Sequence, residues 1–184
     1  MARASSGRKG DAGRKSSGTE PGEKVSVEWL RDHLDDANVR VIHVSRDRRT
    51  YTRWHLPGAP LADLEDEILP RDGNPPDRDR IAASLRRWRV GEGDRIVLYD
   101  DRGGDRWAIA AASLLRAHGV PKARVHVLGG GLPAWRKAGG ATTAELPEVD
   151  LADALRAAVE LAGEPDQRAL EEYRAAADAV EGDS

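Results

Sequence analysis

The sequence contains no cysteine, so no reaction that needs a cysteine of its own is open to this chain of 184 residues. The absence of cysteine also fits a reducing compartment. The chain has no run of about 20 apolar residues, the length that spans a bilayer. Its positively charged residues 1–18 are not followed by the apolar segment of a secretory signal. We therefore expect no membrane insertion and a cytoplasmic location.

The charges are distributed unevenly along a chain whose length suits one main domain. Residues 1–18 hold five basic residues and one acidic residue, whereas residues 150–184 hold ten acidic and three basic residues. Residues 1–22 are mostly Gly, Ser, Lys and Arg, which cannot bury enough apolar surface to fold. We predict a disordered basic tail over 1–22, a folded domain over 23–148 and an acidic helical C-terminal extension over 149–184.

The termini suggest two further expectations. A basic tail can contact RNA or an acidic partner, but this tail has no interleaved aromatic residue to stack on a base, so nucleic-acid binding is not expected. The extension reads as two short helices separated by Gly163-Glu164-Pro165. They are too small for a second core, so they either pack back on the folded domain or stay partly frayed.

From Val25 onward, helical and β-strand patterns alternate. Ser26 is placed to cap a helix that ends near Leu34, and Gly119 is placed to end another. Short β-branched runs predict strands, and apolar residues at helical spacing predict helices between them. The predicted strands are 39–44, 95–99 and 125–128, and the predicted helices are 26–34, 77–88, 106–118 and a short one opened by Pro133. This order predicts an α/β fold in three layers, with a mostly parallel central sheet flanked by helices.

The loop after the strand at 95–99 is the first candidate site, because ligands of open α/β sheets bind beyond the carboxyl ends of the strands. Gly103 and Gly104 let the backbone N–H groups turn inward, and the following helix adds its positive end. The loop is therefore a candidate anion cradle. It matches neither a Walker A loop nor a dinucleotide fingerprint. The candidate residues are Asp100, Asp101, Arg102, Gly103, Gly104, Asp105 and Arg106.

Five sequence motifs, in order, carry a resemblance to a known family. They are VSVEWLRDHL, RRTYTRWHLPGA, LADL, VLYD and VLGGGLPAW. Over about residues 25–140 the chain resembles the rhodanese superfamily of sulfurtransferases, which identifies the domain over 23–148 as rhodanese-like. It is most similar to the amino-terminal half of tandem thiosulfate sulfurtransferases, the half that is usually non-catalytic in the family.

The resemblance also locates the missing nucleophile. In active rhodaneses a cysteine follows the strand, attacks thiosulfate and holds a persulfide on the amides of the loop; the matching position here is Asp100. A carboxylate lacks the sulfur nucleophile that makes and breaks an S–S bond. This chain therefore cannot use the persulfide mechanism. Three loop carboxylates against two arginines make the loop unsuited to an anionic donor. We expect its own aspartates to fill the cradle in part, with Asp105 capping the next helix.

Other positions depart from the family pattern as well. His43 and Ser45 stand where the family's first buried strand has Asp and Arg, and this indicates a paired change, because either charge alone would be uncompensated near the core. Trp54 replaces a glycine and either plugs the pocket or presents an aromatic face to a partner. Gly129 replaces an aspartate. No histidine spacing suggests a metal site, and we expect no metal and no cofactor.

These departures favour a non-catalytic binding or regulatory module in sulfur metabolism. Its expected partner is a protein, either an active sulfurtransferase or a sulfur carrier, and its expected surface comprises Trp54, the acidic loop and the acidic C-terminal helices. One alternative is a sulfurtransferase that acts with a cysteine-bearing partner chain, as half of a split tandem rhodanese. More remote alternatives are Asp100 as a phospho-acceptor and RNA or anion binding by the basic tail.

Overall fold

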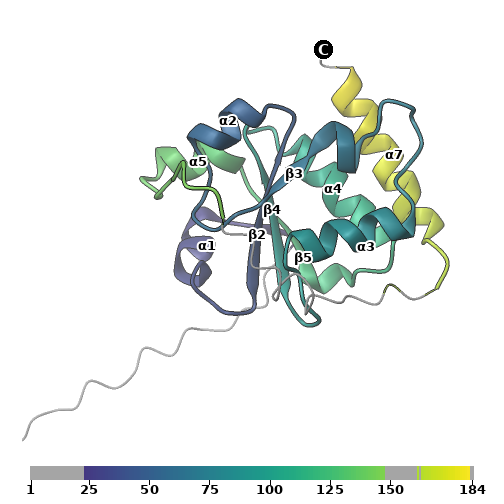
Figure 1. Cartoon of the computed structure of the whole chain (residues 1–184), viewed down its shortest axis with the longest axis horizontal. Helices are drawn as coiled ribbons and strands as arrows, with labels where there is room; N and C mark the ends of the chain where they lie inside the picture. Colours follow the sequence, from purple (N-terminus) through teal and green to yellow (C-terminus); the bar gives the residue numbers. More distant parts are fainter. Residues whose placement is uncertain (1–22, 148–160, 162, 183–184) are drawn as a thin grey trace, which may run out of the picture.

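The computed structural model describes residues 23–147, 161 and 163–182, and within them five parallel strands form one sheet (Figure 1). The strand order across the sheet is β1-β5-β4-β2-β3. The strands are β1 (Lys24–Val25), β2 (Val39–Ser45), β3 (Leu61–Asp63), β4 (Arg95–Asp100) and β5 (Val125–Leu128). The predicted α/β fold with a parallel central sheet is therefore confirmed.

Helices cover both faces of this sheet, which gives the predicted three layers (Figure 1). On one side lie α1 (Val27–His33), α2 (Arg48–Arg53) and α5 (Gly131–Lys137). On the other side lie α3 (Arg78–Arg87), α4 (Arg106–Ala117) and α7 (Gln167–Glu181). Two short segments complete the description, the π-helix η1 (Leu64–Ile68) and the 3-10 helix η2 (Lys122–Arg124).

Alternate side chains of the central strands pack into two hydrophobic clusters, one on each face of the sheet. On β4, Ile96 and Leu98 enter the cluster formed with α3, α4 and α7, whereas Val97 and Tyr99 enter the cluster formed with α1 and α5. Strands buried on both faces have continuous apolar runs, which explains the composition of β4. Each such side chain, once fully buried, stabilises the fold by about 1.5–3 kcal/mol.

The helix boundaries follow the signals in the sequence. Ser26 accepts a hydrogen bond from the Trp29 N–H, as expected for the cap of α1. Asp77 accepts one from the Arg80 N–H at the start of α3. After α4, Gly119 has φ +92°, the left-handed conformation expected of the residue that ends this helix.

The acidic extension packs back on the domain where the structure describes it. α7 lies along α4, with Leu170, Tyr173 and Val180 buried. The Tyr173 hydroxyl donates a hydrogen bond to the Ile68 carbonyl at 2.8 Å. The first predicted helix of the extension and the tail over 1–22 lie outside the described residues. Among the helices that are described, none is long and apolar enough to cross a membrane.

Candidate ligand site at the carboxyl edge of the sheet

The candidate loop begins at the centre of the sheet. β4 ends at Asp100, which pairs in register with Val44 of the neighbouring strand β2. The loop then leads into α4 at Arg106. Because β2 and β4 run in parallel, the residues that follow β2 also reach this edge. The loop after β4 and the segment after β2 are thereby brought together.

Asp100, at the position of the family cysteine, folds back into its own loop. Its side chain is nearly inaccessible, with the whole residue 1% exposed. The Oδ1 atom accepts hydrogen bonds from the backbone N–H groups of Arg102 at 3.1 Å and Gly103 at 3.0 Å. Burial raises the pKa of the Asp100 carboxyl, and the two amides oppose that shift. The expectation that an aspartate fills part of the cradle is confirmed for this residue.

Asp101 turns toward β2, where the two altered family positions lie. The Ser45 hydroxyl donates to Asp101 Oδ2 at 2.6 Å, and His43 Nε2 lies 3.8 Å from the same oxygen. His43 is fully buried, and neither of its ring nitrogens has a hydrogen-bond partner in the described part of the chain. Burial lowers its pKa to about 3, so the ring is neutral at physiological pH. The side chains of His43 and Ser45, the two positions that depart from the family pattern, therefore both lie next to the Asp101 carboxylate.

The expectation for Asp105 was wrong. It occupies the N-cap position of α4, but its backbone is left-handed, with φ +61°, and its side chain caps no amide of the helix. Its carboxylate instead accepts hydrogen bonds from the Gly130 N–H at 2.8 Å and from Lys24 Nζ at 3.0 Å. A side chain that caps a helix usually extends from an N-cap residue with an extended backbone. Asp105 is left-handed instead, and its carboxylate joins α4 to β1 and to the glycine turn after β5.

A cavity of about 400 Å³ opens beside the loop. Its lining comes from the end of β2, the loop, α4 and α7: Arg46, Asp100, Arg102, Gly104, Arg106, Trp107 and Val180. Of the three loop aspartates, only Asp100 is among the described residues that line the cavity, because the carboxylates of Asp101 and Asp105 turn to Ser45 and to Lys24 and Gly130. Among the described residues, the lining holds three guanidinium groups and one carboxylate.

Sequence reasoning missed three of these lining residues. Arg46 directly follows β2, so the rule that pointed to the loop after β4 would also have found it. Trp107 matched the pattern of a core residue and is 8% exposed, yet the guanidinium carbons of Arg46 and Arg102 lie 5.9 and 5.2 Å from its ring centroid. Val180 comes from α7, and no local signal places it there.

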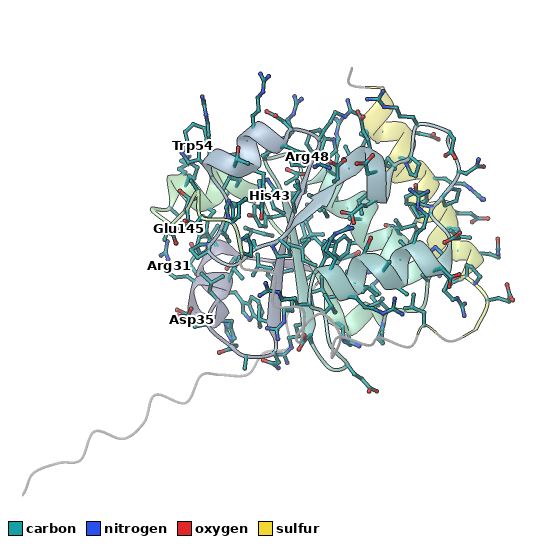
Figure 2. All side chains as sticks on the ribbon, in the orientation of Figure 1. Arg31, Asp35, His43, Arg48, Trp54 and Glu145 are labelled. Carbon is teal, nitrogen blue, oxygen red and sulfur yellow. The ribbon has the colours of Figure 1, made fainter. Side chains whose placement is uncertain are left out.

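Trp54 does not line this cavity. It follows α2, is 40% exposed, and stands at the periphery of the domain, whereas His43 lies inside it (Figure 2). The guanidinium carbon of Arg136, on α5, lies 4.5 Å from the Trp54 ring centroid. Arg49 and Arg53 are exposed one helical turn apart on α2. We call Arg49, Arg53, Trp54 and Arg136 the Trp54 patch; its arginines form no ion pair with the described residues.

Proteins similar to this chain carry the names of sulfurtransferases and of a sulfur carrier. Thiosulfate/3-mercaptopyruvate sulfurtransferase 2 of Arabidopsis thaliana is 34% identical over 130 residues, 62% of this chain and 36% of that protein. The sulfur carrier protein TtuD of Thermus thermophilus is 30% identical over 128 residues, 67% of this chain and 42% of that protein. The chain thus spans less than half the length of these two relatives.

A solved structure and a family model agree with this fold. The 3-mercaptopyruvate sulfotransferase SseA of Escherichia coli superposes with a TM-score of 0.62 at 23% identity, covering 80% of this chain and 57% of SseA. At that identity the likeness establishes the fold. The model of the rhodanese-like domain matches residues 26–138, which run from the cap of α1 to just past α5 and include the loop at Asp100. The chain therefore belongs to the rhodanese-like domain family.

Proposed function

We propose that this chain is a non-catalytic rhodanese domain that binds a protein of sulfur metabolism, either an active sulfurtransferase or a sulfur carrier. The observation that carries the proposal is the state of Asp100. It stands at the nucleophile position, its Oδ1 is engaged by two loop amides, and the whole chain contains no cysteine. A domain that keeps its fold without its nucleophile acts through its surface.

The Trp54 patch is the surface best suited to that partner. Tryptophan and arginine are the residues that most often dominate protein–protein binding energy. The loop aspartates, also expected to form the surface, point inward: Asp100 and Asp105 are buried and the Asp101 carboxylate faces Ser45. Arg136 lies over the Trp54 ring and α2 adds two further exposed arginines, so the complementary partner face is acidic.

The acidic C-terminal helices remain a separate predicted surface. Exposed Glu171 and Glu172 lie on α7, which covers the face of the sheet opposite to α2 and α5 (Figure 1). One small partner cannot contact both surfaces at once. We therefore assign the sulfur-metabolism partner to the Trp54 patch and leave α7 free for a different contact.

Purified protein is expected to show no turnover of thiosulfate and cyanide above a buffer control, because no residue can accept the sulfur. Thiocyanate formation measures this directly, with a cysteine-bearing sulfurtransferase in the same buffer as the positive control. Robust turnover that resists repeated purification would overturn the non-catalytic assignment.

Replacing Trp54 with alanine is expected to weaken binding of the sulfurtransferase or sulfur carrier that co-purifies with the chain. Loss of a central aromatic contact costs about 2 kcal/mol, which is roughly a 30-fold loss of affinity. The charge reversal Arg53→Glu should weaken binding as well, whereas Arg86→Glu, an exposed reversal on α3, should leave it unchanged. Isothermal titration calorimetry measures all four proteins. Equal affinities across the set would contradict the proposed surface.

A second candidate function is support of catalysis by another chain. The named activities of the relatives favour it, since several are sulfurtransferases. On this hypothesis a cysteine-bearing rhodanese domain supplies the nucleophile and this chain completes its active form. Adding the chain to such a partner then raises the partner's kcat, whereas simple binding leaves kcat unchanged. The phospho-acceptor hypothesis is less favourable, because Asp100 is 1% exposed and its Oδ1 is already engaged.

A further inference from the structure

The helix α7 presents to solvent a face whose charge is opposite to that of the Trp54 patch. Among the described exposed residues of 163–182, five are acidic and two are basic. The acidic ones are Glu164, Asp166, Glu171, Glu172 and Asp178. Glu172 pairs with Arg168 at 3.6 Å, whereas Glu171 and Asp178 form no ion pair with the described residues. The last two carboxylates are therefore available to an external cation.

These two carboxylates flank a small side chain. Glu171, Ala175 and Asp178 follow one another at spacings of four and three residues, so they share one face of the helix. All three are exposed, whereas the buried residues of α7 pack on the domain. We call Glu171, Ala175 and Asp178 the α7 face. A flat aromatic ring fits on the alanine of such a surface, while cations beside the ring reach the carboxylates.

The Trp54 patch offers the matching arrangement. Trp54 is exposed, and the Arg136 guanidinium carbon lies 4.5 Å from its ring centroid. Arg49 and Arg53 add two exposed cations from α2. The patch presents a large ring and cations, whereas the α7 face presents a small side chain and carboxylates. The two surfaces are therefore complementary in charge and in the size of their side chains.

These two surfaces cannot meet within one molecule. The Trp54 patch is carried by α2 and α5, which cover one face of the sheet, and α7 covers the other face (Figure 1). Contact therefore requires two copies, with the patch of one against the α7 face of the next. Such a contact is heterologous, so a pair of copies still has one patch and one α7 face open to further copies.

We propose that the chain self-associates head to tail, with the Trp54 patch of one copy bound to the α7 face of another. The Trp54 ring packs on Ala175, and the arginines of the patch pair with Glu171 and Asp178. The regulatory consequence rests on the proposed function: a patch covered by a second copy is closed to the sulfur-metabolism partner. Self-association and binding of that partner therefore exclude each other at this surface.

Sedimentation velocity of the full chain measures the association. At about 0.02 M salt, the weight-average mass is expected to rise steadily from about 10 µM to about 1 mM protein, beyond the mass of a dimer. Raising the salt to about 0.5 M shortens the Debye length from about 20 Å to about 4 Å, so the mass should fall toward that of the monomer. A monomer mass over the whole range at low salt, or a mass that levels off at the dimer, would overturn the proposal.

Two variants alter the two surfaces separately. Trp54→Ala changes the patch and Glu171→Arg changes the α7 face, and each alone should self-associate at least about tenfold more weakly. Mixed in equal amounts, they should form a 1:1 dimer that grows no further, because each supplies the intact surface that the other lacks. The controls are Arg86→Glu and Glu92→Arg, two exposed charge reversals outside both surfaces, and they should assemble as the natural sequence does.

Undiminished assembly of Trp54→Ala or of Glu171→Arg, or a mixture of the two that stays monomeric, would contradict the proposed contact. Calorimetric titration of the sulfur-metabolism partner tests the proposed function separately. If no partner binds while the mixture still forms its dimer, the proposed function fails and the head-to-tail contact stands. If Trp54→Ala weakens partner binding and the chain does not self-associate, the contact between copies fails and the proposed function stands.

Discussion

Replacing Gly131 with alanine is expected to lower the free energy of unfolding by about 3 kcal/mol. A Cβ atom at this position would lie 2.3 Å from the carbonyl oxygen of Asp100, and the backbone there has φ +53°. The contact is with main chain in the middle of the site, so no side-chain rotation can relieve it. Urea unfolding followed by tryptophan fluorescence measures the loss.

Gly139→Ala is the matched control for this variant. Gly139 also has a left-handed backbone, with φ +74°, but a Cβ there would meet nothing within 4 Å. Its cost is therefore the conformational term alone, about 1–2 kcal/mol. If both variants lost the same free energy of unfolding, the close approach of Gly131 to Asp100 would add no cost to the substitution and the prediction would be wrong.

Replacing His43 with leucine is expected to reduce the acid sensitivity of the fold. Burial lowers the pKa of His43 to about 3 in the folded state, compared with an ordinary value of 6.5. As the pH falls below 6.5, the unfolded chain binds a proton here that the folded chain refuses until about pH 3. Stability is lost across that window, by an amount on the order of 4 kcal/mol at its lower end.

Two neighbouring carboxyls act with the opposite sign. Burial raises the pKa of Asp100 and of Asp101 above their ordinary value, so these groups destabilise the fold when ionised, and acidification relieves that cost. The natural sequence therefore shows the sum of both effects. The difference in unfolding free energy between it and His43→Leu isolates the histidine.

The measurement is chemical denaturation of both proteins at several values from about pH 7 to about pH 4. The stability advantage of His43→Leu should grow steadily as the pH falls. His33→Leu, at a half-buried position on α1, controls for the loss of a histidine as such. Parallel curves for the natural sequence and His43→Leu would show that the buried ring does not resist protonation.

The sequence allowed prediction of those elements whose signals are local. β2 and β4 are runs of apolar residues buried on both faces, and α1 carries its own cap at Ser26. Three other elements gave no such signal. α2 is mostly Arg and Thr with only Tyr51 buried, β3 spans three residues, and η1 is a single π-helical turn. Their conformations depend on the sheet against which they lie.

Prediction of the site divides in the same way. Its location followed from strand order alone, since Asp100 ends a central parallel strand. The directions in which the acidic side chains point did not follow from strand order. Asp105 turns to Lys24, 81 residues away, and Asp101 turns to Ser45, 56 residues away. Counting charges in the loop therefore does not give the charge of the cavity lining, because distant partners turn two of the three carboxylates away from it.

The edges of the sheet bear on how any partner can be recognised. β1, with two residues, and β3, with three, stand at the two ends of the strand order. Strands this short offer too few unpaired N–H and C=O groups to template an added strand, which protects the domain against edge-to-edge aggregation. The same shortness disfavours β-augmentation, in which an extended peptide joins an exposed strand through its main chain. We therefore expect a protein that binds this domain to distinguish it by side chains, so that single substitutions at its surface weaken recognition.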